Sequence, residues 1–426
     1  MPGRVLMASW LFPPHSSIGA KRAWRFARHL PALGWLPTVL SRRVPPPGSF
    51  DASDWTLPPE VTLSPTYDAA WMSLLADRGA RAVVRPSSQQ ASADALQRPL
   101  SARLQERWDR FLDAVVPMET AIIHAPHASR ELDRLLPSHD LLWTTSYPYH
   151  THAIGLSAAR RHRRPWVADL RDPWTPNWVH RRKFAPVRSI EARYERAVFE
   201  AADAIVVTTE TLASMERERF PQWAGKIHCV HNAFDGEPSP PRPASPGGGP
   251  LRWVHFGNVY GPWSLETVFR AMARRPGRVV LDNHGKLSDR DRDLAASLGL
   301  RDAVRVMPTL PFEEGMARLR AADALVLAAW NHPDAGLYLQ GKLYDYLSAG
   351  RPIVAESAQR EVGDIVRRTG AGHVIAPGDV AAMTAVIDGT SGEPARDESA
   401  VRYFSAAEAS ARLAAIFDSV TGRKAG

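Results

Sequence analysis

The sequence predicts an α/β protein made of two doubly wound domains, each built on a parallel sheet. The chain has 426 residues, enough for two or three domains of ordinary size. Both halves alternate short apolar runs with helical patterns, which is typical of parallel βαβ units. Between the halves, residues 236–250 hold ten prolines and glycines in fifteen positions. Neither a helix nor a central strand tolerates that composition, so we predict a linker there.

The first half, residues 1–235, contains six predicted strands. A helix is predicted over residues 21–33, because Phe26, Leu30 and Leu33 share one face at helical spacing. The strands are predicted from short apolar runs at residues 4–10, 35–40, 141–145, 166–170, 204–208 and 226–231.

Residues 45–120 are rich in Pro, Ser, Ala and Arg and give the weakest pattern. They contain one amphipathic stretch, residues 100–116, in which Trp108, Phe111, Leu112 and Val115 fall on one face. Such a helix either packs on the core or lies on the surface and meets a membrane or a partner. The sequence leaves both interpretations open.

The second half repeats the alternation over residues 251–400. Strands are predicted at residues 251–256, 278–283, 304–307, 324–328, 352–355 and 373–375, with helices in most of the gaps. Two domains of this kind are expected to place a ligand cleft between the carboxyl ends of their sheets.

Composition narrows the function classes. A net charge of +8 and a pI of about 9.8 favour a phosphorylated ligand, an anionic membrane surface or nucleic acid. We expect no nucleic-acid partner, because no recognised binding module occurs. A single cysteine, Cys229, excludes a disulfide framework. No apolar run suits a membrane span or a signal peptide, so we predict a cytoplasmic location, with peripheral membrane contact left open.

Three strand-to-helix loops carry residues suited to a phosphorylated ligand. After residues 4–10, Ser17 and Gly19 let the backbone approach a ligand next to a helix start. After residues 251–256, the chain continues with Gly257 and Asn258.

The third loop leads into a helix that begins at Gly341 and Lys342 and stops at Gly350. A lysine suits a diphosphate. The carboxylate of Asp345, one turn into the helix, suits a pair of ribose hydroxyls. We therefore predict a nucleotide site in the second half.

These segments resemble a known family. GKLYDYLSAGRPIV, residues 341–354, is similar to the nucleotide-binding helix of family-4-like glycosyltransferases (glycosyl transferases group 1), which have the GT-B fold. FPPHSSIGAKR resembles their N-terminal glycine-containing loop. Segments that recur there in the same order are residues 144–156, 166–174, 206–212, 231–235, 256–261 and 369–379. The resemblance covers nearly the whole chain apart from residues 45–120.

The resemblance implies two Rossmann-like domains facing each other across a cleft. Residues 1–235 would bind the acceptor and residues 251–400 the nucleotide sugar, while a helix in residues 401–426 would pack back towards the first domain. The implied activity is that of a retaining, metal-independent glycosyltransferase that uses a UDP- or GDP-sugar. Asp345 stands where the family has the carboxylate that binds the ribose.

The donor-binding residues follow from the same motifs. They are expected to be Gly19, Gly257, Asn258, Lys286, Gly341, Lys342 and Asp345, with Lys342 and helix N-termini neutralising the leaving diphosphate. The chain departs from the family in two places. Leu337 stands where the family usually has the first of two glutamates, and the usual Arg and Lys after the first strand of the second domain are missing. Lys342 and Lys286 are then left to meet the phosphate charge.

The acceptor side is predicted at the strand ends of the first domain, where a doubly wound sheet presents its site. The catalytic candidates there are His152, Arg171 and Asp172, and His152 or Asp172 would orient or deprotonate the acceptor. Each also has a structural interpretation, as a buried histidine or a paired charge. The acceptor-binding candidates are Phe12, Ser17, Tyr147, Tyr149, Asp169 and Trp174, whose aromatic rings favour a planar or cationic molecule.

We expect a small natural-product acceptor, no metal or other cofactor, and a monomer or homodimer. Three alternatives stay open: a lipid-linked or polysaccharide acceptor at the membrane face, a non-catalytic nucleotide-sugar-binding protein, and a sugar-nucleotide epimerase. The Asp-x-Asp spacing in residues 289–293 is typical of metal-dependent transferases, but it follows Ser288 and opens a charged helix. A structural role at the helix start is therefore predicted.

Overall fold

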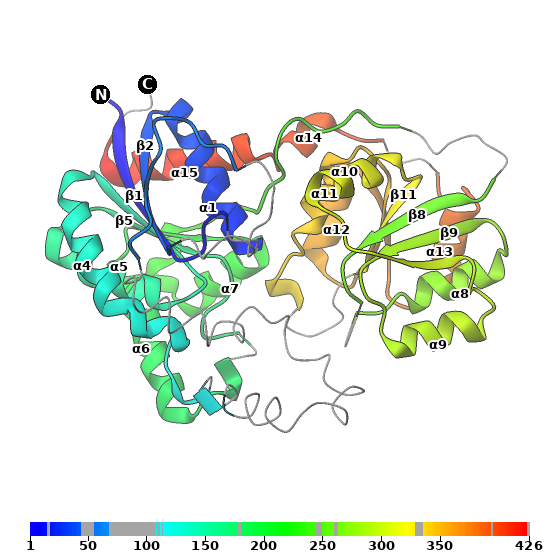
Figure 1. The fold of residues 1–426 in the computed structure, drawn as a ribbon, viewed down its shortest axis with the longest axis horizontal. Coiled ribbons are helices and arrows are strands. Elements are labelled where there is room, and N and C mark those ends of the chain that lie inside the picture. The colour runs from blue at the N-terminus through cyan, green and yellow to red at the C-terminus, as the bar shows by residue number, and fades with distance from the viewer. Residues whose placement is uncertain are drawn as a thin grey trace. The chain divides into compact units, whose positions relative to one another are not determined.

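A computed structural model describes residues 1–14, 18–43, 55–67, 108, 111–112, 114–177, 180–242, 249–259, 263–328, 335–392 and 395–423. The chain divides into two compact units (Figure 1). The first comprises Met1–His231 together with Ala406–Gly426, and the second comprises Asn232–Ser405. Each unit is an α/β layer structure, so the predicted fold class is confirmed.

Within the described residues, the first unit holds a parallel sheet in the order β3-β2-β1-β4-β5-β6-β7. Six of these strands lie where the apolar runs predict them. β3 was not predicted, because it has three residues and lies in the weakly patterned segment. The strands are β1 (Gly3–Ser9), β2 (Trp35–Ser41), β3 (Thr62–Ser64), β4 (Leu141–Thr145), β5 (Trp166–Leu170), β6 (Ala204–Val207) and β7 (Ile227–Cys229).

The strands β1, β2, β4, β5 and β6 are almost completely buried because helices connect and cover them, whereas the edge strand β3 is exposed and the edge strand β7 is partly buried. The helices are α1 (Ile18–His29), α4 (Ala125–Leu135), α5 (His150–His162), α6 (Ala185–Ala201), α7 (Glu210–Arg219) and α15 (Ala406–Thr421). Short 3₁₀ turns are η1 (Leu30–Leu33), η3 (Thr120–His124), η4 (Leu136–Ser138), η5 (His180–Arg182) and η6 (Pro221–Lys226). Most of the amphipathic stretch at residues 100–116 lies outside the described residues.

The second unit holds a parallel sheet in the order β10-β9-β8-β11-β12-β13, counted over its described residues. Its strands are β8 (Leu251–Phe256), β9 (Val279–His284), β10 (Val304–Met307), β11 (Ala324–Ala328), β12 (Ile353–Glu356) and β13 (Gly372–Ile375). Its helices are α8 (Glu266–Arg274), α9 (Asp289–Ser297), α10 (Phe312–Ala321), α11 (Lys342–Ser348), α12 (Arg360–Arg368), α13 (Val380–Ile387) and α14 (Glu398–Arg402), with the 3₁₀ turn η7 (Ala335–Leu337).

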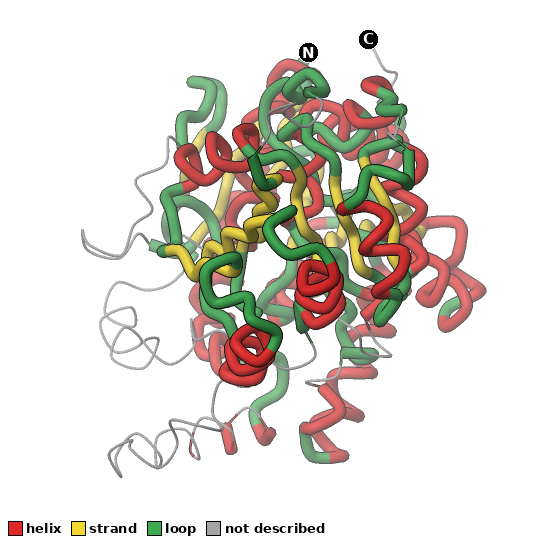
Figure 2. Tube along the Cα trace, turned by 90° about the vertical axis from the view of Figure 1, so that its right-hand side faces the viewer, coloured by secondary structure: helices red, strands yellow, loops and turns green. Residues whose placement is uncertain are grey.

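Alternate residues of these strands belong to two separate cores. Leu325 and Leu327 of β11 pack with residues of α10, α11 and α12, whereas Val326 packs with α8, α9 and α13. Helices therefore cover both faces of the sheet. Figure 2 shows the helices in red and the strands in yellow.

In each sheet the strand order reverses at one point. In the first unit the chain builds outward from β1 to β2 and β3, and then places β4 on the other side of β1. In the second unit the corresponding neighbours are β8 and β11. Ligands of open α/β sheets bind at the carboxyl ends of strands near such a switch point.

The boundary between the units differs from the predicted linker, residues 236–250. The first described part of that segment packs on the second unit, because the Ser239 amide donates to the Ser348 carbonyl (2.8 Å) and the Arg242 amide to Gly350 (3.2 Å). The change of unit comes earlier, between His231 and Asn232.

Near the other end of the chain, residues up to Ser405 belong to the second unit and α15 to the first. On α15, the ring of Phe417 lies 5.4 Å from that of Trp35, and Asp418 accepts a hydrogen bond from the Trp35 indole (3.1 Å). The two units are therefore joined by two crossings of the chain.

Candidate functional site

A cavity of about 160 Å³ opens in the first unit at the carboxyl ends of β4 and β5. Tyr147 and Tyr149 follow β4, while Trp174 and Asn177 follow β5, so adjacent parallel strands bring them to one edge of the sheet. The wall is completed by Glu119, His180, Lys183 and Glu191. We call this cavity the β4–β5 pocket.

The apolar wall of the β4–β5 pocket is a stack of aromatic rings. Tyr149 lies parallel to Trp174, with centroids 5.0 Å apart and planes 9° apart. The Tyr149 hydroxyl donates to the Pro173 carbonyl (2.7 Å), which holds the ring in place. Tyr147 packs edge-on against Tyr149 and is 37% exposed. Three of the predicted acceptor-binding residues thus come together at the cavity, where Tyr147 is exposed and Tyr149 and Trp174 are almost completely buried.

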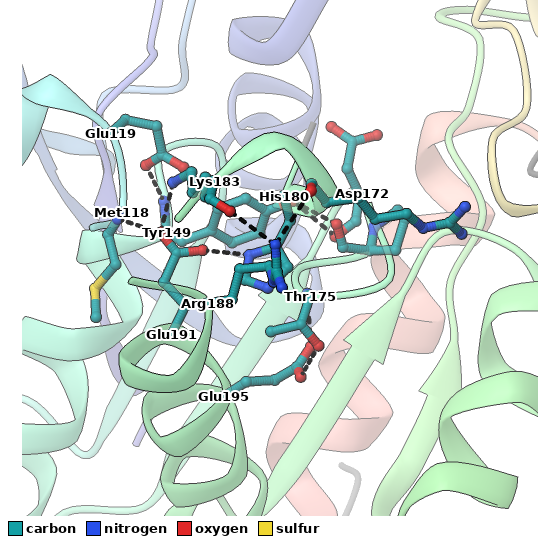
Figure 3. A network of polar contacts seen from close by, with 12 residues as sticks. Met118, Glu119, Tyr149, Asp172, Thr175, His180, Lys183, Arg188, Glu191 and Glu195 are labelled. Carbon is teal, nitrogen blue, oxygen red and sulfur yellow. Dashed lines mark hydrogen bonds and ion pairs between the residues drawn. The ribbon is translucent and has the colours of Figure 1, made fainter. Parts of the chain in front are cut away.

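The polar wall is centred on Glu191, whose side chain is almost completely buried (Figure 3). One carboxylate oxygen lies 2.7 Å from His180 Nδ1, and the other accepts from Lys183 Nζ (2.5 Å) and the Met118 amide (2.6 Å). Burial alone would raise the pKa of Glu191, but the hydrogen bonds from His180, Lys183 and Met118 hold the pKa below its usual value. The carboxylate is therefore ionised at neutral pH.

Helix α6 holds this carboxylate in place. One turn beyond Glu191, the buried Glu195 accepts from the Thr175 amide (3.1 Å) and from Arg219 (2.7 Å). These bonds join α6 to the loop that follows β5 and to the end of α7. Because Glu191 and Glu195 are four residues apart on one helix, they share a face, and both carboxylates are directed towards that loop.

Glu119 on the wall and the buried Met118 before it both have left-handed backbone conformations. Met118 has φ 54° and Glu119 has φ 64°, which is uncommon for residues with a side chain. Both are held by pocket residues, since the Met118 amide donates to Glu191 and a Glu119 carboxylate oxygen accepts from the Tyr149 amide (3.0 Å). Such conformations cluster at functional sites, where the surrounding structure maintains them.

Two predicted residues lie inside the fold. His152 has no exposed surface, its Nδ1 lies 2.9 Å from Thr144 Oγ1, and burial lowers its pKa to about 4. Asp169 is equally buried, and its oxygens are occupied by Arg22 (2.7 Å) and the Thr145 hydroxyl (2.8 Å). In this structure neither side chain has a surface to offer an acceptor, and Asp169 instead anchors α1 to the sheet.

Arg171 lies against Gly19. A Cβ on Gly19 would overlap the Arg171 guanidinium, so the glycine makes room for this side chain at the start of α1. Arg171 Nε lies 3.8 Å from a carboxylate oxygen of Asp172. Of the other predicted residues, Phe12 is 4% exposed and Ser17 lies outside the described residues.

In the second unit, a chain of polar contacts runs along the carboxyl ends of β8 and β9. Asn283 Nδ2 donates to the Gly285 carbonyl (2.8 Å), so its oxygen faces His255 Nδ1 at 2.6 Å. His255 Nδ1 therefore carries the proton, and its Nε2 accepts from Lys342 Nζ (3.0 Å). Lys342 also donates to the Phe256 carbonyl (2.9 Å). We call these residues the Lys342 network.

The side-chain ammonium group of Lys342 is partly shielded from water. Burial lowers its pKa to about 7. Burial and the nearby Lys342 charge also lower the pKa of His255, which keeps that imidazole neutral. The two contacts use two of the three ammonium protons, and the third can meet an anion. An incoming phosphate would compensate for the lost hydration.

Glycines bring the backbone close to this lysine. Gly257 has φ 115° and lies against Lys342 Nζ, while Gly285 has φ 143° and would overlap Gly257 if it carried a Cβ. Asn258 fixes the neighbouring loop by accepting from the Lys286 amide (2.9 Å). The Lys286 side chain is exposed. The structure thus brings together Gly257, Asn258 and Lys342 among the predicted donor-binding residues.

The remaining donor-side candidates lie on or next to α11. Gly341 is its N-cap and Asp345 is partly buried in its first turn. The helix ends at Ser348, and Gly350 follows with φ 70°, where a helix stop was predicted.

The Asp-x-Asp segment has the structural role predicted for it. Ser288 caps α9 by accepting from the Asp291 amide (3.0 Å). Asp291 in turn accepts from the Ser264 hydroxyl (2.7 Å) and is almost fully buried.

Over the described ranges, no helix is both long and apolar enough to cross a membrane.

Several residues of the two sites carry no signal in the sequence. Glu119, His180, Lys183 and Glu191 come from loops and from α6, with no motif spacing, and His255 and Asn283 sit inside strand patterns. For His255 and Asn283, the one signal of a site in the sequence is a polar residue within an apolar strand pattern. The other four residues give no such signal.

The chain has the fold of GT-B glycosyltransferases. It resembles sucrose-phosphate synthase (tll1590) from Thermosynechococcus elongatus, with a TM-score of 0.56 and 13% identity over 98% of this chain and 96% of that one. It also resembles Anabaena Alr3699/HepE in complex with UDP, with a TM-score of 0.56 and 14% identity over 98% of this chain and 100% of that one. A third similar structure is a glycosyltransferase from Rickettsia africae ESF-5, with a TM-score of 0.58 and 11% identity over 99% of this chain and 100% of that one.

No protein-family model matches the sequence, and comparison with curated proteins gives no match. At the identities found among solved structures, the likeness establishes the fold. It confirms the predicted GT-B architecture.

Proposed function

We propose that the protein is a glycosyltransferase that moves a sugar from a UDP- or GDP-linked donor to a hydroxyl-bearing acceptor. The Lys342 network carries the donor half of this proposal. It places a partly buried ammonium group and a glycine backbone at the carboxyl ends of β8 and β9, in a GT-B unit. Asp345, one turn beyond Lys342, is proposed to bind the ribose. The HepE structure named above contains UDP, which supports a nucleotide ligand.

The β4–β5 pocket carries the acceptor half. Its volume of about 160 Å³ is below the roughly 300–1,000 Å³ of sites for drug-sized ligands, so it suits a single ring of the acceptor. Tyr147, which is 37% exposed, offers that ring an aromatic contact, and the stacked pair of Tyr149 and Trp174 supports Tyr147 from behind. We propose a small natural-product acceptor. Retention of the anomeric configuration and independence from metal are part of the proposal and rest on the family resemblance.

A thermal-shift screen tests the donor half. UDP, GDP, ADP and dTDP are compared, and a ligand present at a hundred times its Kd adds about 2.7 kcal/mol to the free energy of unfolding. UDP or GDP should raise the melting temperature of the wild type more than that of Lys342→Met. If no nucleotide shifts the transition, the proposal fails.

Turnover measurements then distinguish a glycosyltransferase from the alternative functions. Nucleotide release from UDP-glucose or GDP-mannose in the presence of EDTA tests metal independence, and the anomeric proton signal of the product reports retention. Binding without release would instead favour a non-catalytic binding protein. Interconversion of the sugar nucleotide without an acceptor would favour an epimerase.

A membrane-face acceptor is the second candidate. Trp108 and Phe111 are 56% and 48% exposed, and their rings stack at 5.6 Å. Exposed aromatic pairs of this kind suit a lipid surface. Co-sedimentation with anionic vesicles tests it: binding that Trp108→Ser with Phe111→Ser abolishes supports a lipid-linked acceptor, and absence of binding supports the small molecule.

A further inference from the structure

The β4–β5 pocket contains a histidine–carboxylate pair outside the predicted catalytic set. Glu191 is ionised and only accepts hydrogen bonds, so a neutral His180 must carry its proton on Nδ1, which lies 2.7 Å from that carboxylate. The lone pair of His180 is then on Nε2. The carboxylate thus selects one tautomer and fixes the ring, as the orienting partner of a general base does.

The second ring nitrogen is the one available to a ligand. His180 lines the pocket, and within the described ranges its Nε2 contacts no hydrogen-bonding side chain or carbonyl. His180 is 7% exposed, whereas His152 has no exposed surface and its Nε2 is buried without a hydrogen-bond partner. His180 therefore has the access to a ligand that His152 lacks.

We propose that His180 takes the proton of the acceptor hydroxyl, and that Glu191 is its positioning residue. The acceptor would be an alcohol on a ring that packs against Tyr147, whose side chain lines the β4–β5 pocket and is 37% exposed. This inference rests on the proposed function, which supplies the nucleotide-sugar donor.

The step balances without any further reagent. The acceptor O–H bond breaks, and its proton passes to His180 Nε2. A lone pair of the oxygen forms the new bond to the anomeric carbon, while the bond from that carbon to the diphosphate breaks and its electron pair leaves with the nucleoside diphosphate. The Glu191 carboxylate then stabilises the imidazolium. This role of His180 does not depend on which face of the sugar is attacked.

The test compares His180→Gln with the wild type in nucleotide release from UDP-glucose or GDP-mannose. The acceptors are water alone and three ring-sized probes: myo-inositol, D-glucose and phenol. His180→Gln should lower kcat by about 10²- to 10⁴-fold, the range for loss of a general base, with the donor KM changed less than about threefold. A kcat within threefold of the wild type would overturn the proposal.

Further variants separate positioning from structural effects. Glu191→Gln should lower kcat, and Glu191→Asp should recover part of the loss, because a carboxylate can again accept from His180 Nδ1 and select its tautomer. His162→Gln is the matched control, since His162 Nε2 lies 2.9 Å from Asp133 in another histidine–carboxylate pair away from the pocket. It should keep the wild-type kcat.

Failure of this inference can be distinguished from failure of the proposed function. If the wild type binds no nucleotide and releases none, the proposed function fails. Accessibility is measured separately, by modification with diethyl pyrocarbonate and peptide mass spectrometry. His180 should be modified and His152 should not. An unreactive His180 would overturn the inference whatever the turnover, because a sealed Nε2 cannot reach an acceptor.

Discussion

Raising the pH from 7 to 9 should weaken UDP binding about fiftyfold, through the charge of Lys342. Burial lowers the pKa of this lysine to about 7, so the empty site is half protonated at pH 7 and about 1% protonated at pH 9. A bound diphosphate keeps the ammonium charged. Affinity is therefore highest below pH 7 and falls as the pH rises above it, by about 2.3 kcal/mol at pH 9 if Lys342 stays charged in the complex.

Isothermal titration calorimetry with UDP at pH 7, 8 and 9 measures this effect. The terminal phosphate, with a second pKa near 6, is ionised over the whole range and adds no slope. Titrations in two buffers with different ionisation heats should show uptake of about one proton per UDP at pH 9. If GDP is the nucleotide that shifts the melting temperature, it replaces UDP.

The controls are two lysine variants. Lys342→Met should bind weakly and show no pH dependence. Lys226→Met removes another lysine whose pKa is lowered by burial, one that donates to backbone carbonyls in the first unit, and it should keep the steep dependence. A wild-type Kd constant within twofold from pH 7 to 9, or no proton uptake, would refute the reasoning.

Three substitutions test how the fold supports the two sites. Asp169→Asn leaves the buried Arg22 without its counter-charge and should lower the free energy of unfolding by about 3–5 kcal/mol in urea denaturation; a loss below 1 kcal/mol would contradict the anchoring role. Gly19→Ala should displace the Arg171 guanidinium and lower transfer, and adding it to Arg171→Ala should cost nothing more; additive losses in this double-mutant cycle would count against the contact. Gly285→Ala forces a side chain into φ 143° and should weaken UDP binding at least tenfold by calorimetry, so unchanged affinity would show that the loop adapts.

The sheets were predictable because their signals are local. Apolar runs at residues 141–145 and 166–170 coincide with β4 and β5, and parallel pairing then places the residues that follow them side by side. That is why Tyr149 and Trp174 could be assigned to one site. The short β3 gives no comparable run, and its place beside β2 depends on tertiary contacts.

The polar halves of the sites were less predictable, because tertiary packing selects them. His152 follows β4 as a site residue would, but the first turn of α5 is buried on every side, so periodicity does not show that this ring points inward. His180 and Glu191 are eleven residues apart and meet only because α6 packs against the β5 loop. In the second unit, His255 and Asn283 lie within strands. The apolar residues around them predict a buried strand and do not indicate a ligand site.

The position of the second chain crossing determines the order in which the two units can be completed during protein synthesis. Trp35 is fully covered in the finished first unit, and part of its cover comes from Phe417 and Asp418. At about 5–20 residues per second, a ribosome needs roughly 20 to 75 s to extend the chain from Trp35 to these partners. At the end of that interval, once Ser405 has been added, the second unit has every segment of its own, while the first still lacks its last helix. The unit that is begun first is therefore the one completed last.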